Sequence, residues 1–276
     1  MTVRKHMTGS PITVTAGASL SECAQILHRE RIRHLPVVTE KGALFGLLTD
    51  FDVFLRGQMV DDEAFRPYDP SATWLQAHHL CRRVDVTVGP DDALLDGLLR
   101  LLGTRQDIVV VIEHDRVVGV LCEHDVVGIA AAMDCEMSWP LRPQGYRLLT
   151  VDRDDPAIRA RHMMANERIR HLIVLDQGQL HSVLSFRDVA IEGTLSESQG
   201  AGFVGPRHAE FGQPGIPVCE AARRMSVGKI GCLPLVNSQG VPIDIVTRTD
   251  VIRAVVRVLE SAVPGERYDW GRTDEP

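Results

Sequence analysis

Aromatic side chains are scarce in this 276-residue chain, at 5% of its residues, and no apolar run approaches the roughly 20 residues needed to cross a bilayer. The N-terminal segment 1–14 carries basic residues but lacks the apolar stretch of a signal peptide. The six cysteines include no Cys-x-x-Cys pair, so neither a disulfide framework nor a zinc knuckle is indicated. We therefore expect a cytoplasmic protein with free thiols and no membrane contact.

Several kinds of functional site are also missing from the sequence. No Gly-x-Ser-x-Gly nucleophile elbow occurs. His78 and His79 stand near Cys81, but adjacent histidine side chains diverge and rarely hold one metal ion. The net charge of -7 opposes a general affinity for nucleic acids, because Lys or Arg must supply every phosphate contact. We expect no enzymatic activity, no metal or cofactor, and no nucleic-acid partner.

An internal repeat is the strongest positive signal. The hexapeptide Glu-Arg-Ile-Arg-His-Leu occurs at 30–35 and again at 167–172, an offset of 137 residues. Each copy is followed by two short apolar runs and by a hydroxyl residue three positions before an aspartate. Weaker copies of this ending occur at 117–125 and at 243–250. The chain therefore consists of four similar units.

In each unit, segments with the hydrophobic spacing of a helix and segments with that of a strand follow each other in the same order. In the first unit, Leu20, Cys23, Ala24 and Leu27 recur at the spacing of one helix face, and Ser19 has the position of an N-cap. Two short apolar strands follow, and a second helix is expected to start near Thr49. The pattern predicts an α/β (α+β) fold of four β-α-β-β-α units that associate in pairs, because so small a sheet cannot stand alone.

The breaks in these patterns give the predicted boundaries. The parts are unit one at 1–57, an insertion at 58–80, unit two at 81–133, a linker at 134–146, unit three at 147–193, a linker at 194–206, unit four at 207–260 and a polar tail at 261–276.

Three segments of the first unit resemble the cystathionine beta-synthase (CBS) domain, which pairs into the Bateman module. They are 7–14, with Met-Thr-Gly-Ser-Pro-Ile-Thr-Val; 33–38, with Arg-His-Leu-Pro-Val-Val; and 46–52, with Gly-Leu-Leu-Thr-Asp-Phe-Asp. The resemblance covers nearly the whole chain as two modules, similar to the gamma subunit of AMP-activated kinase. It implies a regulatory protein that binds AMP, ADP or ATP in clefts between paired repeats.

The resemblance also implies a set of ligand-binding residues. In the first unit, Asp52 would hold the ribose, Thr49 would lie beside the ribose or α-phosphate, and Arg33 and His34 would face phosphate. The residues expected to border the base are Ile12, Ile32 and Pro36. The matching residues of unit three are Arg170, His171, Ser185, Arg187 and Asp188, and those of unit four are Lys229, Pro234, Thr247 and Asp250.

Units two to four depart from this pattern, unit three by Ser182 where a glycine is usual. Unit two has Cys122 in place of the hydroxyl residue, and Gln106-Asp107 where unit one has Arg33-His34. We therefore do not expect the residues of unit two alone to form an occupied ligand site. Asp244 of unit four stands where a glycine is usual and adds negative charge near an anionic ligand.

Other interpretations of the same residues remain open. A hydroxyl residue three positions before Asp is also an ordinary capping box, and arginines such as Arg33 are also found as solvated residues at helix ends. The alternatives to a nucleotide sensor are a ligand-independent dimerisation or scaffold module and a sensor of S-adenosylmethionine. An unknown protein partner is expected, and the modules either pair within one chain or form a homodimer.

Overall fold

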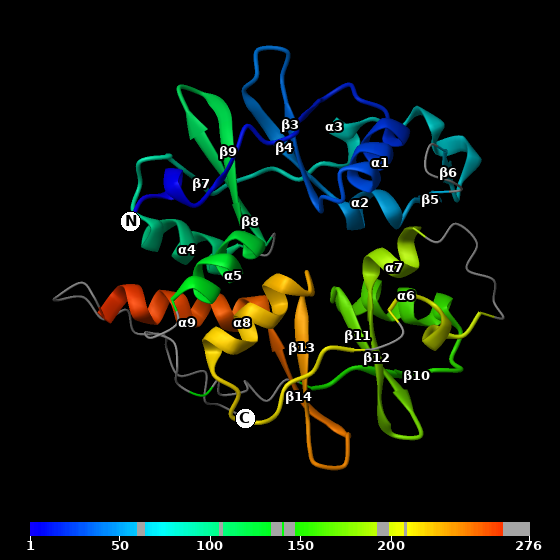
Figure 1. Ribbon diagram of the computed structural model, residues 1–276. Helices are drawn as coiled ribbons and strands as arrows, with labels where there is room; N and C mark the ends of the chain where they lie inside the picture. The colour runs from blue at the N-terminus through cyan, green and yellow to red at the C-terminus, as the bar shows by residue number, and fades with distance from the viewer. Residues whose placement is uncertain are drawn as a thin grey trace, which may run out of the picture.

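The computed structural model confirms the α/β class, with four similar units arranged around a common centre (Figure 1). It describes residues 1–59, 64–104, 107–133, 140, 147–191, 199–206 and 209–261. The predicted tail therefore lies almost wholly outside the described residues, as does most of the linker at 134–146. Within the described ranges, no helix has the length and apolar character needed to span a membrane.

The first repeat has the predicted order of elements. Ser19 caps the first helix by accepting a hydrogen bond from the Glu22 amide, and Thr49 and Asp52 form a reciprocal capping box at the second. The elements are β2 (Val14–Thr15), α1 (Leu20–Arg29), β3 (His34–Val38), β4 (Leu44–Thr49) and α2 (Asp50–Phe54).

The other three repeats follow the same plan with small differences. The elements of the second are β7 (Thr87–Val88), α4 (Leu94–Gly103), β8 (Ile108–Glu113), β9 (Arg116–Cys122) and α5 (Glu123–Ala132). Those of the third are β10 (Thr150–Asp152), α6 (Ala157–Glu167), β11 (His171–Asp176), β12 (Gln179–Ser185) and α7 (Phe186–Ile191). Those of the fourth are α8 (Val218–Val227), β13 (Cys232–Val236), β14 (Pro242–Thr247) and α9 (Arg248–Ser261). In the fourth, a single parallel bridge between Gly212 and Leu235 takes the place of the first strand.

Strand register defines which residues are equivalent among the repeats. The residue that opens the central strand pairs with the residue that precedes the second helix in every repeat. These pairs are His34 with Thr49, Ile108 with Cys122, His171 with Ser185, and Cys232 with Thr247. Asp107 is therefore the equivalent of Arg33, and Ile108 that of His34. The alignment of Gln106-Asp107 with Arg33-His34 was wrong by one residue, and Gln106 lies outside the described residues.

The N-terminal residues pack on the second repeat rather than on the first. The short strand β1 (Thr8–Gly9) runs antiparallel to β9, with Thr8 opposite Val120, and extends the second sheet to four strands. The preceding 3-10 turn η1 (Val3–Lys5) places Val3 in the core beneath that sheet. The first two repeats are thereby linked through the chain segment that opens the protein.

The predicted insertion and a linker fold back on their own repeats. The insertion region contains β5 (Gly57–Met59), β6 (Phe65–Pro67), η2 (Pro70–Trp74) and α3 (Ala77–Leu80). The amide of Ala77 donates to the carbonyl of Ala18 beside the start of α1. In the third repeat, η3 (Ala201–Phe203) lies likewise beside the start of α6, where the Ala201 amide donates to the Asp155 carbonyl. The unit boundaries given above remain predictions.

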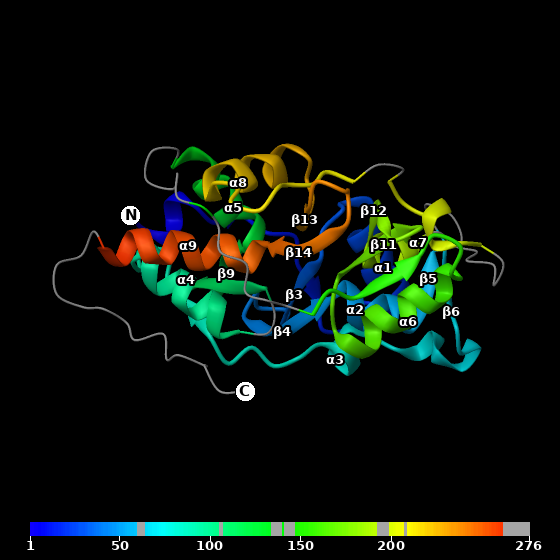
Figure 2. The ribbon, with the colours of Figure 1, turned by 90° about the horizontal axis from the view of Figure 1, so that it is seen from below.

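Two hydrophobic cores join the modules within one chain. One core combines buried residues of repeats one and three, and the other combines those of repeats two and four. Helices α4 and α5 meet α8 and α9 across the middle of the molecule (Figure 1). Seen from below, the four repeats form a flattened body (Figure 2). The modules therefore pair by covering each other's helices.

Phe186 tests the contact between repeats one and three. Its side chain is 1% exposed and stacks on Phe51 with 4.0 Å between ring centroids. We expect Phe186→Ala to lower the free energy of unfolding by about 3 to 5 kcal/mol, because it leaves a cavity in the shared core. Urea unfolding measures the loss. Phe45→Ala is the control: Phe45 is 48% exposed, and an equal loss in both variants would contradict a shared core.

Candidate functional site

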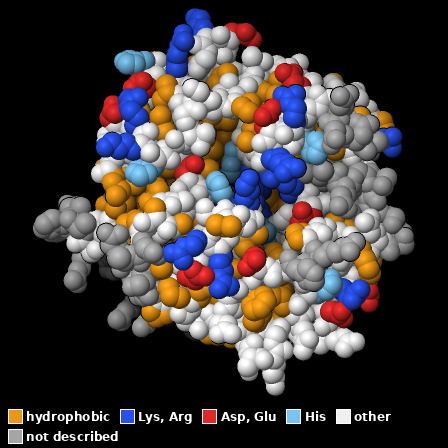
Figure 3. Space-filling view, viewed as in Figure 1, with side chains coloured by type: hydrophobic (Ala, Val, Ile, Leu, Met, Phe, Trp, Pro, Cys, Tyr) orange, Lys and Arg blue, Asp and Glu red, His pale blue; other side chains and the backbone are white. Residues whose placement is uncertain are grey.

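A cavity of about 390 Å³ lies where the four repeats converge. Its lining includes one equivalent residue from each repeat, the residue just before the central strand: Arg33, Asp107, Arg170 and Gly231. Basic side chains (Lys or Arg, blue) and histidines (pale blue) also gather around a hollow near the middle of the face drawn in Figure 3. Because the four repeats have different residues at this equivalent position, these residues determine the charge of the cavity lining.

Repeat three supplies an apolar wall. Leu149, Ile169 and Ile173 line the cavity, together with Ile245 of repeat four. With the 137-residue offset, these three residues of repeat three are the equivalents of Ile12, Ile32 and Pro36. The wall therefore consists of the positions expected to border a base, but in the third repeat and not in the first.

Arg170 connects the cavity to the first repeat. Its Nη1 atom lies 2.7 and 2.9 Å from the two carboxylate oxygens of Asp50, and its Nε atom lies 3.4 Å from Asp107. The guanidinium also lies 4.7 Å from the centre of the Phe51 ring. Because the side chains of Arg170 and Asp50 are only 14% and 6% exposed, this ion pair is shielded from solvent.

Two other arginines in the cavity have no carboxylate partner among the described residues. Arg33 is partly buried, and burial together with the nearby Arg248 and Arg170 lowers its pKa to about 10. Arg248 is 8% exposed; it donates through Nη2 to the carbonyl of Ile230, while its buried Nε has no partner. These two cations are available to an anion. Arg147 and Arg168 add exposed cations to the lining.

Within the described part of the chain, the carboxylates that line the cavity are Asp107 and Glu123, both from repeat two. Glu123 accepts a hydrogen bond of 3.1 Å from the hydroxyl of Thr249. Burial and the nearby Asp107 raise its pKa to about 7, against the opposing effect of Arg248. The folded state binds this proton more tightly than the unfolded chain, so the group lowers stability as the pH rises from about 4.5 through 7.

His171 is held neutral in the wall of the cavity. Burial lowers its pKa well below the ordinary value, with a further contribution from Arg33, Arg248 and Arg170. Its ring packs directly against Gly231, where a side-chain carbon would collide with it. The glycine of repeat four thus makes room for the histidine of repeat three.

Asp250 does not line the cavity, but its carboxylate is hydrogen-bonded to Thr247, which does. One oxygen of its carboxylate accepts hydrogen bonds from the Thr247 amide and hydroxyl, at 2.8 and 2.7 Å. The other oxygen, Oδ1, is buried without a hydrogen bond and lies 3.5 Å from Arg253. Burial raises the pKa of this carboxyl. Asp250 therefore combines a capping contact with a second oxygen that can accept another hydrogen bond.

In two of the other repeats, the equivalent aspartate uses both oxygens within the protein. Asp52 accepts from Thr49 with one oxygen and from Arg82 at 2.8 Å with the other. Asp125 accepts from the Cys122 amide with one oxygen and from Thr8 at 3.2 Å with the other. Both aspartates thus act as caps that are already fully engaged.

Asp188 of repeat three lies under a loop. Its carboxylate accepts from the amide and hydroxyl of Ser185, at 2.8 and 2.7 Å. Gly205, whose φ of +79° suits glycine, lies against the same carboxylate. Neither Asp188 nor Ser185 lines the central cavity.

The structure brings four of the predicted residues together in the cavity lining, namely Arg33, Arg170, His171 and Thr247. The remaining residues lie elsewhere. Ile12 is 40% exposed, Lys229 is exposed, and Arg187 donates to the carbonyl of Arg31. His34, Ile32, Pro36 and Pro234 also lie outside the lining.

Sequence reasoning missed Glu123 and Arg248. Both directly follow the residue that precedes the second helix, and Asp50 is their equivalent in the first repeat. An alignment of the four repeats on this residue would have shown a charge here in three of them. The spacing Gly-x-G-x-x-G at 200–205 also went unnoticed. It forms the 3-10 turn η3 rather than a strand-to-helix phosphate loop.

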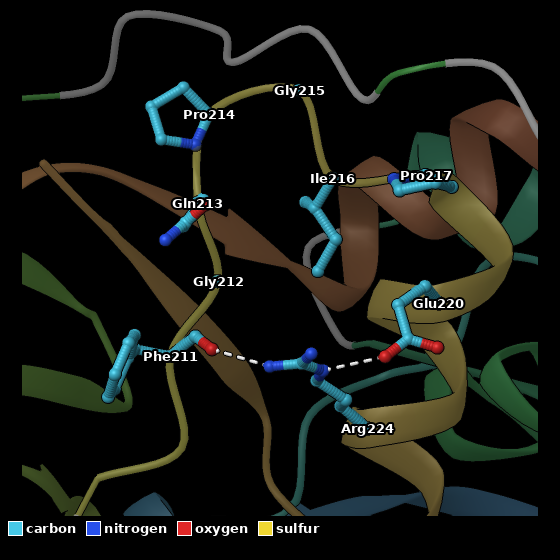
Figure 4. Close-up of a pocket in the computed structure, with 9 residues that line it drawn as sticks. All are labelled: Phe211, Gly212, Gln213, Pro214, Gly215, Ile216, Pro217, Glu220 and Arg224. Atoms are coloured by element: carbon cyan, nitrogen blue, oxygen red, sulfur yellow. Dashed lines mark hydrogen bonds and ion pairs between the residues drawn. The ribbon is translucent and has the colours of Figure 1, made fainter. Parts of the chain in front are cut away.

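A second hollow, of about 480 Å³, lies between the loop 211–217 and the first turns of α8 (Figure 4). Arg224 spans it, with Nε 2.8 Å from Glu220 and Nη1 donating to the carbonyl of Phe211. Because these charged groups satisfy each other, the hollow offers little to a charged ligand. Among the described residues, no cluster of His, Cys, Asp and Glu could hold a metal ion. The central cavity is therefore the candidate site.

Comparison with known proteins identifies a matching family model and several similar proteins. The family model of the CBS domain matches residues 3–56, 145–192 and 213–257. An uncharacterized protein of Methanocaldococcus jannaschii is 22% identical over 95% of this chain and 63% of its own length. An inosine-5'-monophosphate dehydrogenase of Korarchaeum cryptofilum is 46% identical over 20% of this chain. The chain thus spans 63% and 11% of these relatives.

A solved structure resembles the whole arrangement. It is a Methanocaldococcus jannaschii protein described as a proposed archaeal homolog of g-AMPK, with a TM-score of 0.76 and 15% identity over 92% of this chain and 100% of that chain. At this identity the likeness shows the fold. The second repeat is the one that the family model does not match.

The pair of Arg170 and Asp50 tests the contact between the modules at the cavity. We expect Asp50→Asn to lower the free energy of unfolding by about 3 kcal/mol, because it leaves a buried guanidinium without its main partner. Chemical denaturation measures the change. Asp91→Asn removes the same charge from the exposed pair with Arg4 and should leave stability essentially unchanged. Equal effects would show that the buried pair does not hold the modules together.

Proposed function

Since the chain belongs to the CBS-domain family, we propose that it is a regulatory protein that binds an adenine nucleotide in its central cavity. It has no catalytic role in this proposal, and occupancy of the cavity changes its fit to a protein partner or to a second copy of the chain. The cytoplasm stays the predicted location.

The charge of the cavity is the observation that carries the proposal. Among the residues that the structure describes, five arginines and two carboxylates line it, in a protein whose net charge is -7. Arg33 and Arg248 lack carboxylate partners among the described residues, and guanidinium groups suit phosphate. A local excess of cations in an acidic protein favours a phosphorylated ligand. It disfavours S-adenosylmethionine, whose sulfonium is itself a cation.

The cavity region also offers contacts for the base and the ribose of a nucleotide. The wall of Leu149, Ile169 and Ile173 offers an apolar surface for a base. Asp250 offers a buried carboxylate oxygen for a ribose hydroxyl, in the role that family resemblance gives to this aspartate. A volume of about 390 Å³ lies within the usual range for small-molecule sites.

The ligand-independent scaffold receives less support. Such a module needs exposed helix faces, but α4, α5, α8 and α9 cover one another within the chain. Pairing with a second copy would have to use other surfaces.

Thermal unfolding with AMP, ADP, ATP or S-adenosylmethionine tests this function. At about a hundredfold excess over the dissociation constant, a nucleotide should stabilise the protein by about 2.7 kcal/mol, which raises Tm by roughly 5 to 10 °C. Asp250→Asn should abolish most of this shift, because its free oxygen is lost as an anionic acceptor.

Asp52→Asn is the matched control, since it changes an equivalent cap whose second oxygen is bound by Arg82. It should lower Tm without ligand but keep the nucleotide-induced shift. No shift with any nucleotide would refute the proposal, and loss of the shift in Asp52→Asn alone would place the site in the first module.

A further inference from the structure

Glu123 lines the cavity but belongs to repeat two, whereas most of the lining residues belong to repeats three and four. It is the first residue of α5 in repeat two, whereas the apolar wall belongs to repeats three and four. Thr249, in the first turn of α9, donates its hydroxyl to Glu123 over 3.1 Å. The carboxylate is thus fixed between the N-terminal turns of two helices that belong to different modules.

Apart from the exposed Arg147 and Arg168, the charges at the centre of the cavity already face one another in equal numbers before any ligand enters. Arg33, Arg170 and Arg248 are the cations, and the carboxylates that contact or face them are Asp50, Asp107 and Glu123. Arg170 is engaged by Asp50 and Asp107. A phosphate dianion would add two negative charges to this set and would lie in one cavity with Asp107 and Glu123. One way to restore the balance is to neutralise a carboxylate.

We propose that Glu123 is a specificity-determining residue of the cavity, which admits a phosphate dianion only together with one proton taken up from solvent at its carboxyl group. The inference rests on the proposed function, because it concerns the same cavity and its nucleotide. It makes binding of a phosphorylated ligand depend on pH, whereas binding of the same ligand without phosphate does not.

The surroundings of Glu123 set the range of pH. Burial, with a smaller contribution from Asp107 in front of β8, raises the pKa of Glu123 to about 7. Arg248 and Thr249 of α9 and Arg33 in front of β3 act in the opposite direction. Arg170 faces the same carboxyl group. A bound dianion favours the protonated form further. Affinity for the phosphorylated ligand therefore falls as the pH rises above 7, where the free protein has lost this proton.

Calorimetric titration with AMP and with adenosine tests the inference. Between pH 7.0 and 8.5 the phosphate is mostly a dianion, since its second pKa is near 6. For the unaltered protein, AMP affinity should fall with pH, approaching about tenfold per pH unit at the upper end. Adenosine affinity should stay constant. Glu123→Gln, which can still accept from Thr249, should bind AMP with no such decline and about tenfold more tightly at pH 8.5.

Two further variants distinguish the proposed role of Glu123 from a general effect of net charge and from a failure of Glu123→Gln to fold. Asp91→Asn removes one negative charge from an exposed ion pair and should keep the decline of the unaltered protein. Asp107→Asn removes the neighbour that raises the Glu123 pKa, so the decline should begin at lower pH. This variant keeps the test decisive if Glu123→Gln does not fold.

The outcomes distinguish the two proposals. AMP binding that is independent of pH in the unaltered protein, or a decline that persists in Glu123→Gln, overturns the role of Glu123 and leaves the nucleotide site intact. Absence of AMP binding at every pH overturns both. A decline seen equally with adenosine would place the titrating group away from the phosphate and would also refute the inference.

Discussion

A sheet of two to four short strands cannot cover the two helices that flank it, and the rest of this structure depends on that limit. Each repeat has to bury its helices against another repeat, and the chain does so by combining repeats one and three in one core and repeats two and four in the other. This pairing brings four equivalent backbone positions to one point. The cavity at that point is thus a consequence of how the repeats exclude water.

Once four equivalent positions meet, differences among the repeats become differences within one site. The position before the central strand holds Arg33, Asp107, Arg170 and Gly231. Four arginines would repel one another, and four glycines would leave a site without charge. The actual set gives cations for an anion, a carboxylate that moderates them, and space for the ring of His171. The second repeat, which the CBS model does not match, contributes both acidic groups.

The order of elements in each repeat could be predicted, because hydrophobic spacing and capping residues are local. Thr49 and Asp52 form the expected capping box for this reason. The pairing of β1 with β9 could not be predicted, because β1 has only two residues and its partner lies more than a hundred residues away. The same limit applies to the site. The 137-residue offset makes Leu149, Ile169 and Ile173 the equivalents of Ile12, Ile32 and Pro36. Only the packing of the modules shows that the set in the third repeat, and not the set in the first, lines the cavity.

In the proposed function, occupancy of the cavity would reach the whole molecule through groups that line it. Arg170 is at once a lining residue and the partner of Asp50 on the other module, and Glu123 is bound to Thr249 across the second core. An anion that attracts Arg170 competes with Asp50, and one that favours protonated Glu123 alters its contact with Thr249. A ligand shifts a conformational equilibrium only by its different affinity for the two states. Here such a difference has a physical source, because the groups that would bind the ligand are the same groups that join the two modules.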